Sequence, residues 1–501
     1  MHVEQSRYLI HQIDLVFTLR DSCPWLHEFA FKDFYEYILP YRLNDEKPDF
    51  WRDSILQIKE LITSNTRHYD DRRYSVYNLI KELDNVLSPS ILPSSVDIPD
   101  PIIGNHTLAC IDHSYLELCA YRGLGIPAAI DFVPCWANLN GSHYWCVPID
   151  PRFKDAKPNE ISNKNVAKIY RQTYSIQSIL QAGKDEFIPP LFQNPFITDV
   201  TEKYVNTAQV TLPLPKSKVK FTHAYLAVFN NLEWKPICWS KPEKKKISFT
   251  NLGRGVVYLP VYYSGTSMKN LNYPFILNQE GRAQFLIPDT VNTQKLHLTR
   301  KYPVEKTRTL HNRFMQNSTL QCALDSSFLQ ITAASHIKQP SIMDYYTIRI
   351  RAHQLSQYLR YLFNGIGNIA ELQFYDQQHQ LIKPSRVLSP KTNDTRKAFD
   401  NDPLSYATLR DSIVIDFGKP ITLSEVRLLP RNNANGIYPE NIYELLYYSQ
   451  EGWHTLGIQK ANANSIEFDR VPTNALYWLR NRTGGREERI FTYENGVMRF
   501  W

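Results

Sequence analysis

Residues 105–150 read NHTLACIDHSYLELCAYRGLGIPAAIDFVPCWANLNGSHYWCVPID, and the structure of the region around them can be inferred from this stretch. Thr107 can serve as the N-cap of a helix whose first turn contains Cys110. The residues at the spacing of one helical face are Ile111, Tyr115, Leu118 and Arg122. Gly123 ends this helix, and Pro127 prevents its continuation.

Two strands are expected after the helix. Ala128–Val133 (AAIDFV) is almost wholly apolar, which predicts a buried strand. His143, Trp145 and Val147 alternate along a second strand, so their side chains should share one face of it.

Cys110 and His143 are the residues of this stretch best suited to chemistry. Unpaired backbone N–H groups and the positive end of the helix dipole favour a thiolate at a helix N-terminus, and a nearby imidazolium lowers a cysteine pKa further. A cysteine nucleophile also needs a base, which the fold rather than sequence adjacency brings to it. His143 follows Cys110 by 33 positions, which suits such a pair.

The stretch resembles bacterial transglutaminase-like domains. The residues that carry the resemblance, in the order and spacing of that family, are Cys110, Arg122–Pro127 (RGLGIP), Asp131-Phe132, Trp136 and His143-Tyr144-Trp145. The resemblance implies a papain-like core with Cys110 as nucleophile and His143 as base. It also implies a third catalytic residue on the next strand, for which Asp155 is better placed than Asp150.

The sequence departs from the family at two places. Leu108-Ala109 precedes the cysteine where the family has Gly-Asp or Gly-Ser, and Cys146 stands where the family often has asparagine. The implied reaction is attack of the Cys110 thiolate on a peptide or amide bond, with His143 as base and then acid. Water or an amine would resolve the thioester, and the backbone N–H of Cys110 could donate to the oxyanion.

A zinc site is the competing interpretation of the same residues. Cys110-x-x-His113 and His143-x-x-Cys146 resemble zinc-ligand spacing. On a strand, however, positions three apart face opposite sides, so His143 and Cys146 cannot both reach one ion. We therefore predict neither a metal nor a cofactor.

Length and composition predict a multidomain α+β protein that does not bind nucleic acid. The chain has 501 residues, with 31 tyrosines and 24 phenylalanines, which suits a mostly β protein with a helical portion. The net charge of +7 is scattered, and the one dense run, Lys241–Lys246 (KPEKKK), is expected in a solvated hairpin turn. Seven cysteines at irregular spacing predict no disulfide framework.

No apolar run is long enough for a membrane span, and residues 1–12 lack a signal-peptide pattern. We expect a cytoplasmic protein if Met1 is the true start. We expect a cell-envelope or secreted protein if the chain is a fragment of an exported precursor, as the resemblance of Phe31–Arg42 to larger exported relatives suggests.

The pattern along the chain predicts five regions. Helical spacing covers residues 1–95, and the transglutaminase-like core covers residues 96–205. From residue 206 to 303 short strands divided by Pro, Asn and Gly indicate an immunoglobulin-like β-sandwich. A further β-sandwich region is expected over residues 304–380, and an independently folding domain over residues 381–501.

Residues 381–501 resemble a discoidin (F5/8 type C), galactose-binding-like jelly roll. The segments that carry this resemblance are Ala398-Phe399-Asp400, Asp402-Pro403-Leu404 and Ser412–Gly418 (SIVIDFG). Two functions remain open. The first is a cysteine-dependent hydrolase or acyl transferase acting on a peptide or glycoprotein. The second is a catalytically inert cell-envelope protein that binds a protein or a cell-surface or dietary glycan.

Overall fold

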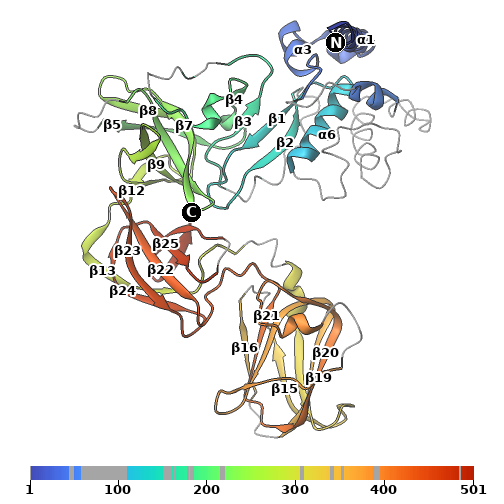
Figure 1. Ribbon diagram of the computed structural model, residues 1–501, viewed down its shortest axis with the longest axis vertical. Coiled ribbons are helices and arrows are strands. Elements are labelled where there is room, and N and C mark those ends of the chain that lie inside the picture. Colours follow the sequence, from blue (N-terminus) through green and yellow to red (C-terminus); the bar gives the residue numbers. More distant parts are fainter. Residues whose placement is uncertain are drawn as a thin grey trace. The chain divides into compact units, whose positions relative to one another are not determined.

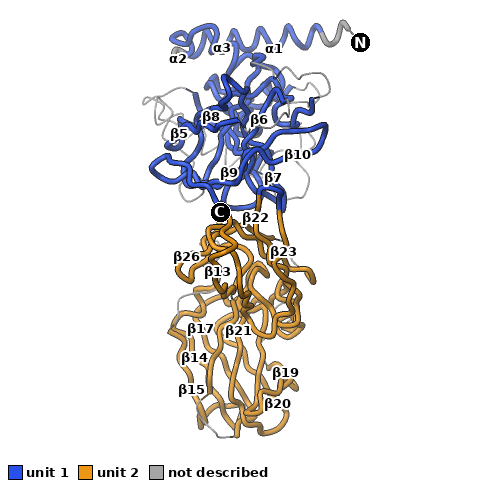
Figure 2. The backbone as a smooth tube through the Cα atoms, turned by 90° about the vertical axis from the view of Figure 1, so that its left-hand side faces the viewer, with its two compact units in different colours: residues 1–287, 450–452, 501 blue, residues 288–449, 453–500 orange. Residues whose placement is uncertain are grey.

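The computed structural model describes residues 2–43, 50–57, 110–149, 161, 165–177, 180, 186–214, 221–304, 310–338, 344–350, 355–388, 395–484 and 487–501. The protein is mostly β-sheet, with a small N-terminal helical region and several separate sheets, as expected for a multidomain α+β chain. It divides into two compact units (Figure 2). Unit 1 comprises residues 1–287, 450–452 and 501, and unit 2 comprises residues 288–449 and 453–500.

The N-terminal region of unit 1 is helical where the structure describes it. Its elements are α1 (His2–Ser22), α2 (Pro24–His27), α3 (Phe31–Tyr37) and the helical residues 51–57. The last of these abuts the end of the central helix, because a Cβ at Gly123 would lie 2.5 Å from Ile55 Cγ2. The helical character predicted for this region is thus confirmed within residues 2–43 and 50–57, while residues 44–49 and 58–95 lie outside the described residues.

The core of unit 1 contains the predicted helix and both predicted strands (Figure 1). Its elements are α6 (Cys110–Gly123), β1 (Ala128–Val133), β2 (His143–Pro148), β3 (Tyr170–Gln172) and β4 (Ile197–Asp199). The strands form an antiparallel sheet in the order β2-β1-β3-β4. Along β1 and β2, Ala128 pairs with Pro148 and Val133 with His143.

The two faces of this sheet bury different partners. The helix α6 covers the face that carries Ile130 and Cys146, in one apolar cluster with Leu118. The opposite face carries Val133 and Trp145 in a separate cluster. This division follows from the register, because directly paired residues of an antiparallel sheet point to the same side and neighbours along a strand to opposite sides.

The remaining strands of unit 1 form a β-sandwich. One sheet pairs β5 (Thr207–Pro213) with β8 (Lys246–Gly253). The other contains β6 (Ala224–Asn230), β7 (Glu233–Ser240), β9 (Val256–Ser264), β10 (Ser267–Asn270), β11 (Phe275–Leu277) and β12 (Ala283–Phe285). The sandwich abuts the core closely, since a Cβ at Gly253 would lie 1.7 Å from the Val166 carbonyl oxygen.

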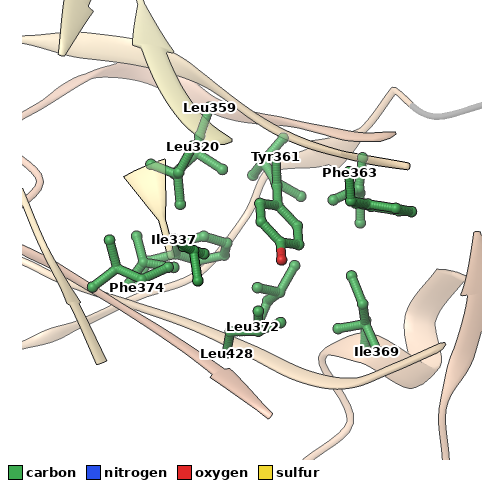
Figure 3. Close-up of a cluster of buried hydrophobic side chains, with 14 of the residues drawn as sticks. Leu320, Ile337, Leu359, Tyr361, Phe363, Ile369, Leu372, Phe374 and Leu428 are labelled. Atoms are coloured by element: carbon green, nitrogen blue, oxygen red, sulfur yellow. The ribbon is translucent and has the colours of Figure 1, made fainter. Parts of the chain in front are cut away.

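Unit 2 contains a larger sandwich built around one long strand. Its elements are η5 (Leu310–Met315), β14 (Ser318–Ala323), β15 (Ile331–Ile337), β16 (Tyr346–Arg349), β17 (Ser356–Tyr375), β18 (Leu381–Ile382), β19 (Arg386–Val387), η6 (Thr395–Ala398), β20 (Ala407–Ile421) and β21 (Glu425–Pro430). The first half of β17 pairs with β14, its second half pairs with β18 and β21, and β20 pairs with residues along both halves. Side chains from both halves, such as Tyr361 and Phe374, meet in one buried cluster (Figure 3).

A second β assembly of unit 2 joins segments that are distant in the sequence. The strand β13 (Asp289–Leu298) pairs with β24 (Ile466–Thr473). The other strands are β22 (Ile442–Ser449), β23 (Gly452–Lys460), β25 (Tyr477–Asn481), β26 (Ile490–Glu494) and β27 (Val497–Phe500). Residues on both sides of this pairing, including Leu296 and Phe468, share one apolar cluster.

Two predicted boundaries differ from the structure. The boundary between residues 380 and 381 falls inside a sheet, because β17 pairs with β18, β20 and β21. The boundary at residue 303 falls after β13, although the last strand of the unit 1 sandwich ends at Phe285. Residues 381–430 therefore complete a sandwich that begins near residue 310, and the rest of the predicted 381–501 domain pairs with β13.

Candidate functional site

Cys110 is the first residue of α6, and its side chain is exposed. The other six cysteines are buried. Ser114 Oγ, one turn along the helix, donates a hydrogen bond to the Cys110 carbonyl oxygen at 2.6 Å. Thr107, the predicted N-cap, lies outside the described residues. The Cys110 thiol is therefore chemically accessible.

Tyr144 of β2 is near enough to Cys110 for the two side chains to interact electrostatically. Burial raises the pKa of the Tyr144 phenol, and the negative charge of a Cys110 thiolate raises it further. Tyr144 packs against the apolar cluster that α6 forms with the sheet, so its ring lies on the helix side. The start of α6 and the start of β2 are therefore at the same end of the sheet.

His143 lies on the opposite side of the sheet. Its ring stacks on Trp136 at 5.8 Å and on Trp145 at 5.6 Å between centroids. Trp136 and Trp145 belong to the cluster on the face that α6 does not cover. The predicted shared face of His143 and Trp145 is thus confirmed, and it is the face remote from the helix.

The structure thus brings Cys110 and His143 to one end of the sheet but directs them to its two sides. Asp155 and Asp150 lie outside the described residues, so the identity of a third residue stays a prediction. A direct contact between the Cys110 thiol and the His143 imidazole stays a prediction as well.

A buried ion pair lies on the same face as His143. Arg171 donates two hydrogen bonds to Asp131, from Nε to Oδ1 at 2.7 Å and from Nη2 to Oδ2 at 2.8 Å. The Tyr204 hydroxyl donates to Asp131 Oδ2, and Trp145 Nε1 donates to the Tyr204 oxygen at 3.4 Å. These side chains connect three strands of the core with the segment that leaves it.

The charges of this network reinforce one another. Burial lowers the pKa of Arg171, but the hydrogen-bonded carboxylate of Asp131 outweighs burial and raises it above the ordinary value. Burial and the charge of Asp131 both raise the pKa of Tyr204. Arg171 therefore stays charged and Tyr204 stays protonated at neutral pH, which suits a structural role better than proton transfer.

Sequence reasoning missed this network, although a signal for it was present. Asp131 is the one charged residue in the apolar strand AAIDFV, and its side chain is fully buried. A buried carboxylate requires a cationic partner, because an unpaired charge is costly to transfer from water. The sequence could not identify that partner, since Arg171 is 40 residues away.

Arg122 holds the turn between α6 and β1. It is fully buried, and its Nη2 donates to the Ala128 carbonyl oxygen at 3.0 Å. Its guanidinium also lies 4.4 Å from the centre of the Tyr174 ring. Arg122 therefore stabilises the helix-turn-strand connection and does not face solvent.

The geometry also bears on the zinc interpretation. Cys146 belongs to the cluster beneath α6, whereas His143 stacks with the tryptophans on the other face. His113 lies near Glu117 of the same helix, at 3.6 Å. Within the described ranges, no group of three or more His, Cys, Asp or Glu residues is arranged to hold a metal ion.

A second candidate site is a cavity of about 740 Å³ in unit 2, which we call the tyrosine cavity. It is lined by three partly exposed tyrosines: Tyr345, Tyr375 and Tyr438. The polar side chains in its lining include Asn401, Asp402, Asn441 and Asn464. It lies where the large sandwich meets the loop after β21 and the loops of the second β assembly.

Hydrogen bonds and a cation hold the tyrosines in place. Gln373 Nε2 donates to the Tyr345 hydroxyl at 3.3 Å, and the Tyr375 hydroxyl donates to Gln373 Oε1 at 3.0 Å. The Arg427 guanidinium lies 4.6 Å from the centre of the Tyr375 ring. Burial raises the pKa of Tyr345 and of Tyr438, so both phenols stay neutral donors. The cavity is therefore an ordered, amphipathic surface.

No family model, curated protein or solved structure matches the chain. None of the helices in the described part of the chain is long and apolar enough to cross a membrane.

Proposed function

We propose that the chain is a glycan-binding protein of a cell envelope or of the secreted fraction, and that its core is catalytically inert. The core would be papain-like and transglutaminase-like, followed by an immunoglobulin-like sandwich and a galactose-binding-like jelly roll. The observation that carries the proposal is the tyrosine cavity. The placement of His143 on the side of the sheet remote from α6 supports an inert core.

The chemistry of the tyrosine cavity matches that of a neutral oligosaccharide. A pyranose ring has an apolar C–H face and a rim of hydroxyl groups. A tyrosine ring offers an apolar surface with a polar tip. The amides of Asn401, Asn441 and Asn464 each offer both donors and an acceptor to hydroxyl groups. A volume of about 740 Å³ is in the range of small-ligand sites.

The test is a glycan array followed by calorimetry with the best neutral oligosaccharide. We expect Tyr375→Ala and Tyr438→Ala to weaken binding at least about tenfold, because each removes a ring that the sugar would stack on. The matched control is Tyr358→Ala, which removes a partly exposed tyrosine of the same strand as Tyr375 but outside the cavity. Equal affinities for wild type and both cavity variants would reject the proposal, and so would a ligand found only among proteins.

A cysteine-dependent hydrolase is the second candidate, and the exposure of Cys110 at the start of α6 favours it. In this function the Cys110 thiolate would attack the amide carbonyl and the amine would leave with a proton. Water would then release the acid and restore the thiol.

Thiol reactivity and peptide cleavage separate the two functions. A hydrolase predicts rapid alkylation of Cys110 by iodoacetamide below pH 8, and cleavage that both Cys110→Ala and His143→Ala abolish. An inert core predicts that no cleavage is detected and that Cys110→Ala keeps its glycan affinity. Cleavage that survives Cys110→Ala would reject the hydrolase.

A further inference from the structure

A second cavity, of about 890 Å³, lies within unit 1, and we call it the lysine cavity. The core supplies one wall through β3 and β4, including Tyr170 and Thr198. The strands β7 and β8 of the sandwich supply the other wall. The loop from β7 to β8, which links the two sheets of the sandwich, carries the run KPEKKK, which the sequence alone assigned to a solvated turn.

Three exposed lysines of this loop form no ion pair with the residues that the structure describes. Lys241, Lys244 and Lys246 line the cavity and are exposed. Among the described residues, none of the three takes part in an ion pair. The fourth lysine of the lining, Lys168, is 3% exposed and is neutralised by Asp199. The cavity therefore has a net positive charge, with Glu243 as the remaining carboxylate of the lining.

A tight turn in this loop holds Lys244 and its neighbour Lys245 in an unfavourable backbone conformation. Lys244 has a φ of 44° and Lys245 a φ of 66°. Two backbone hydrogen bonds between Glu243 and Lys246, both of 2.8 Å, close the two-residue loop. Positive φ at both central positions defines a type I′ turn, which favours Asn and Gly because a side chain with a Cβ is strained there.

Two other two-residue hairpins among the described residues have at least one favoured residue. The turn Asn231-Leu232, with φ of 50° and 67°, begins with asparagine. The turn Asn495-Gly496, with φ of 51° and 79°, has the preferred pair. Lys244-Lys245 has neither residue. A residue type that strains the backbone at its position, beside a cavity, is typical of a functional site.

We propose that the lysine cavity binds an acidic oligosaccharide, a sugar chain that carries sulfate or carboxylate groups. The ammonium groups of Lys241, Lys244 and Lys246 would contact the anionic groups. The exposed groups around them include two hydroxyls and an amide, of Ser248, Thr250 and Asn194, beside the carboxylate of Glu243. Trp239 is partly exposed and offers a ring face for stacking. An acidic peptide fits less well, because peptide recognition uses apolar anchor pockets and depletes lysine from its centre.

The test measures binding of the full chain to heparin fragments, to oligogalacturonate and to neutral dextran. We expect binding to the two acidic sugars only, with an affinity that falls as salt rises because exposed charges are screened. The triple variant Lys241→Gln/Lys244→Gln/Lys246→Gln should lose at least about tenfold in affinity. Trp239→Phe should weaken the binding of the oligosaccharides more than it weakens the binding of inorganic sulfate.

Lys245→Gln is the matched control, because Lys245 occupies the same turn but does not line the cavity. It should stay within about twofold of wild type. The variant Lys244→Asn should fold at least as stably as wild type and still bind more weakly, which separates loss of function from loss of folding. Tyr375→Ala should leave heparin binding unchanged, so this proposal can fail independently of the neutral glycan site.

Three results would overturn the proposal. The first is a triple variant with wild-type affinity for heparin fragments. The second is a loss for Lys245→Gln as large as that for Lys244→Asn, which would indicate nonspecific attraction to the net charge. The third is polyglutamate binding as tight as heparin binding at equal charge, which would make the ligand an acidic peptide.

Discussion

The stability of the core sheet depends on a pair of buried charged residues. Asp131 and Arg171 are 0% and 6% exposed, and each is the partner of the other. Such a pair contributes little net stability when it forms, but the loss of one partner leaves a buried charge without a counterion. Replacing one residue of the pair therefore tests whether the Asp131 network stabilises the fold.

We predict that Asp131→Asn lowers the free energy of unfolding by about 3–5 kcal/mol, because Arg171 keeps its charge in a buried site. Urea unfolding followed by circular dichroism measures the loss. The control is Glu233→Gln, which breaks a pair with Lys235 whose side chains are 68% and 35% exposed. This control should change stability by less than about 1 kcal/mol. A similar, small effect for both variants would contradict the structural role of the pair.

Strand β17 carries a buried carboxyl group whose titration should make the stability of unit 2 depend on pH. Glu371 is 1% exposed, and burial together with the neighbouring Asp400 raises its pKa from 4.5 to about 8. Between pH 4.5 and about 8, Glu371 therefore holds a proton in the folded state and releases it in the unfolded chain. The stabilisation is complete below pH 4.5 and declines as pH rises toward 8, where it is lost.

We predict that the urea midpoint of the wild type falls between pH 5 and 9 more steeply than that of Glu371→Gln, whose amide does not titrate. The variant should be the more stable of the two at pH 9. The exposed carboxylate of Glu494 provides the control, since Glu494→Gln should keep the wild-type pH dependence. Parallel pH profiles for wild type and Glu371→Gln would show that Glu371 is not protonated in the fold.

At the scale of elements, β17 explains why the predicted domain boundary differs from the structure. This 20-residue strand has register shifts between Leu362 and Ile366 and between Ile369 and Glu371. Such irregularities bend a strand and let its two halves pair with different neighbours. Both halves contribute to one core, so β20 and β21 cannot form the same sandwich without β17.

At the scale of the whole molecule, the pairing pattern predicts which fragments fold. Residues 288–501 contain β17 with its partners and β13 with β24, so this fragment should unfold cooperatively. Residues 381–501 lack β13, β14 and β17, so this fragment should not, because β20, β21 and β24 lose their pairing strands. Thermal unfolding followed by circular dichroism compares them. A cooperative transition of residues 381–501 would restore the boundary that the sequence predicts.

Local features of the core could be read from the sequence. The helix ends at Gly123, Ala128–Val133 is a buried strand, and the rings of His143 and Trp145 share a face. Each of these depends on neighbours within a few positions, through periodicity, glycine or proline. The helix that contains Cys110 was predictable for the same reason, and Cys110 is its first described residue.

The face on which each side chain lies in the folded core was decided by the tertiary structure alone. Alternation along β2 separates His143 from Tyr144, but it does not say which face α6 will cover. That choice depends on how the helix returns onto the sheet, and it leaves Tyr144 beside Cys110 and His143 among the tryptophans. The sequence likewise could not predict the partner of Asp131, the division of β17 between its neighbours, or either cavity. Each joins residues far apart in the chain, and no local pattern specifies which distant segments meet.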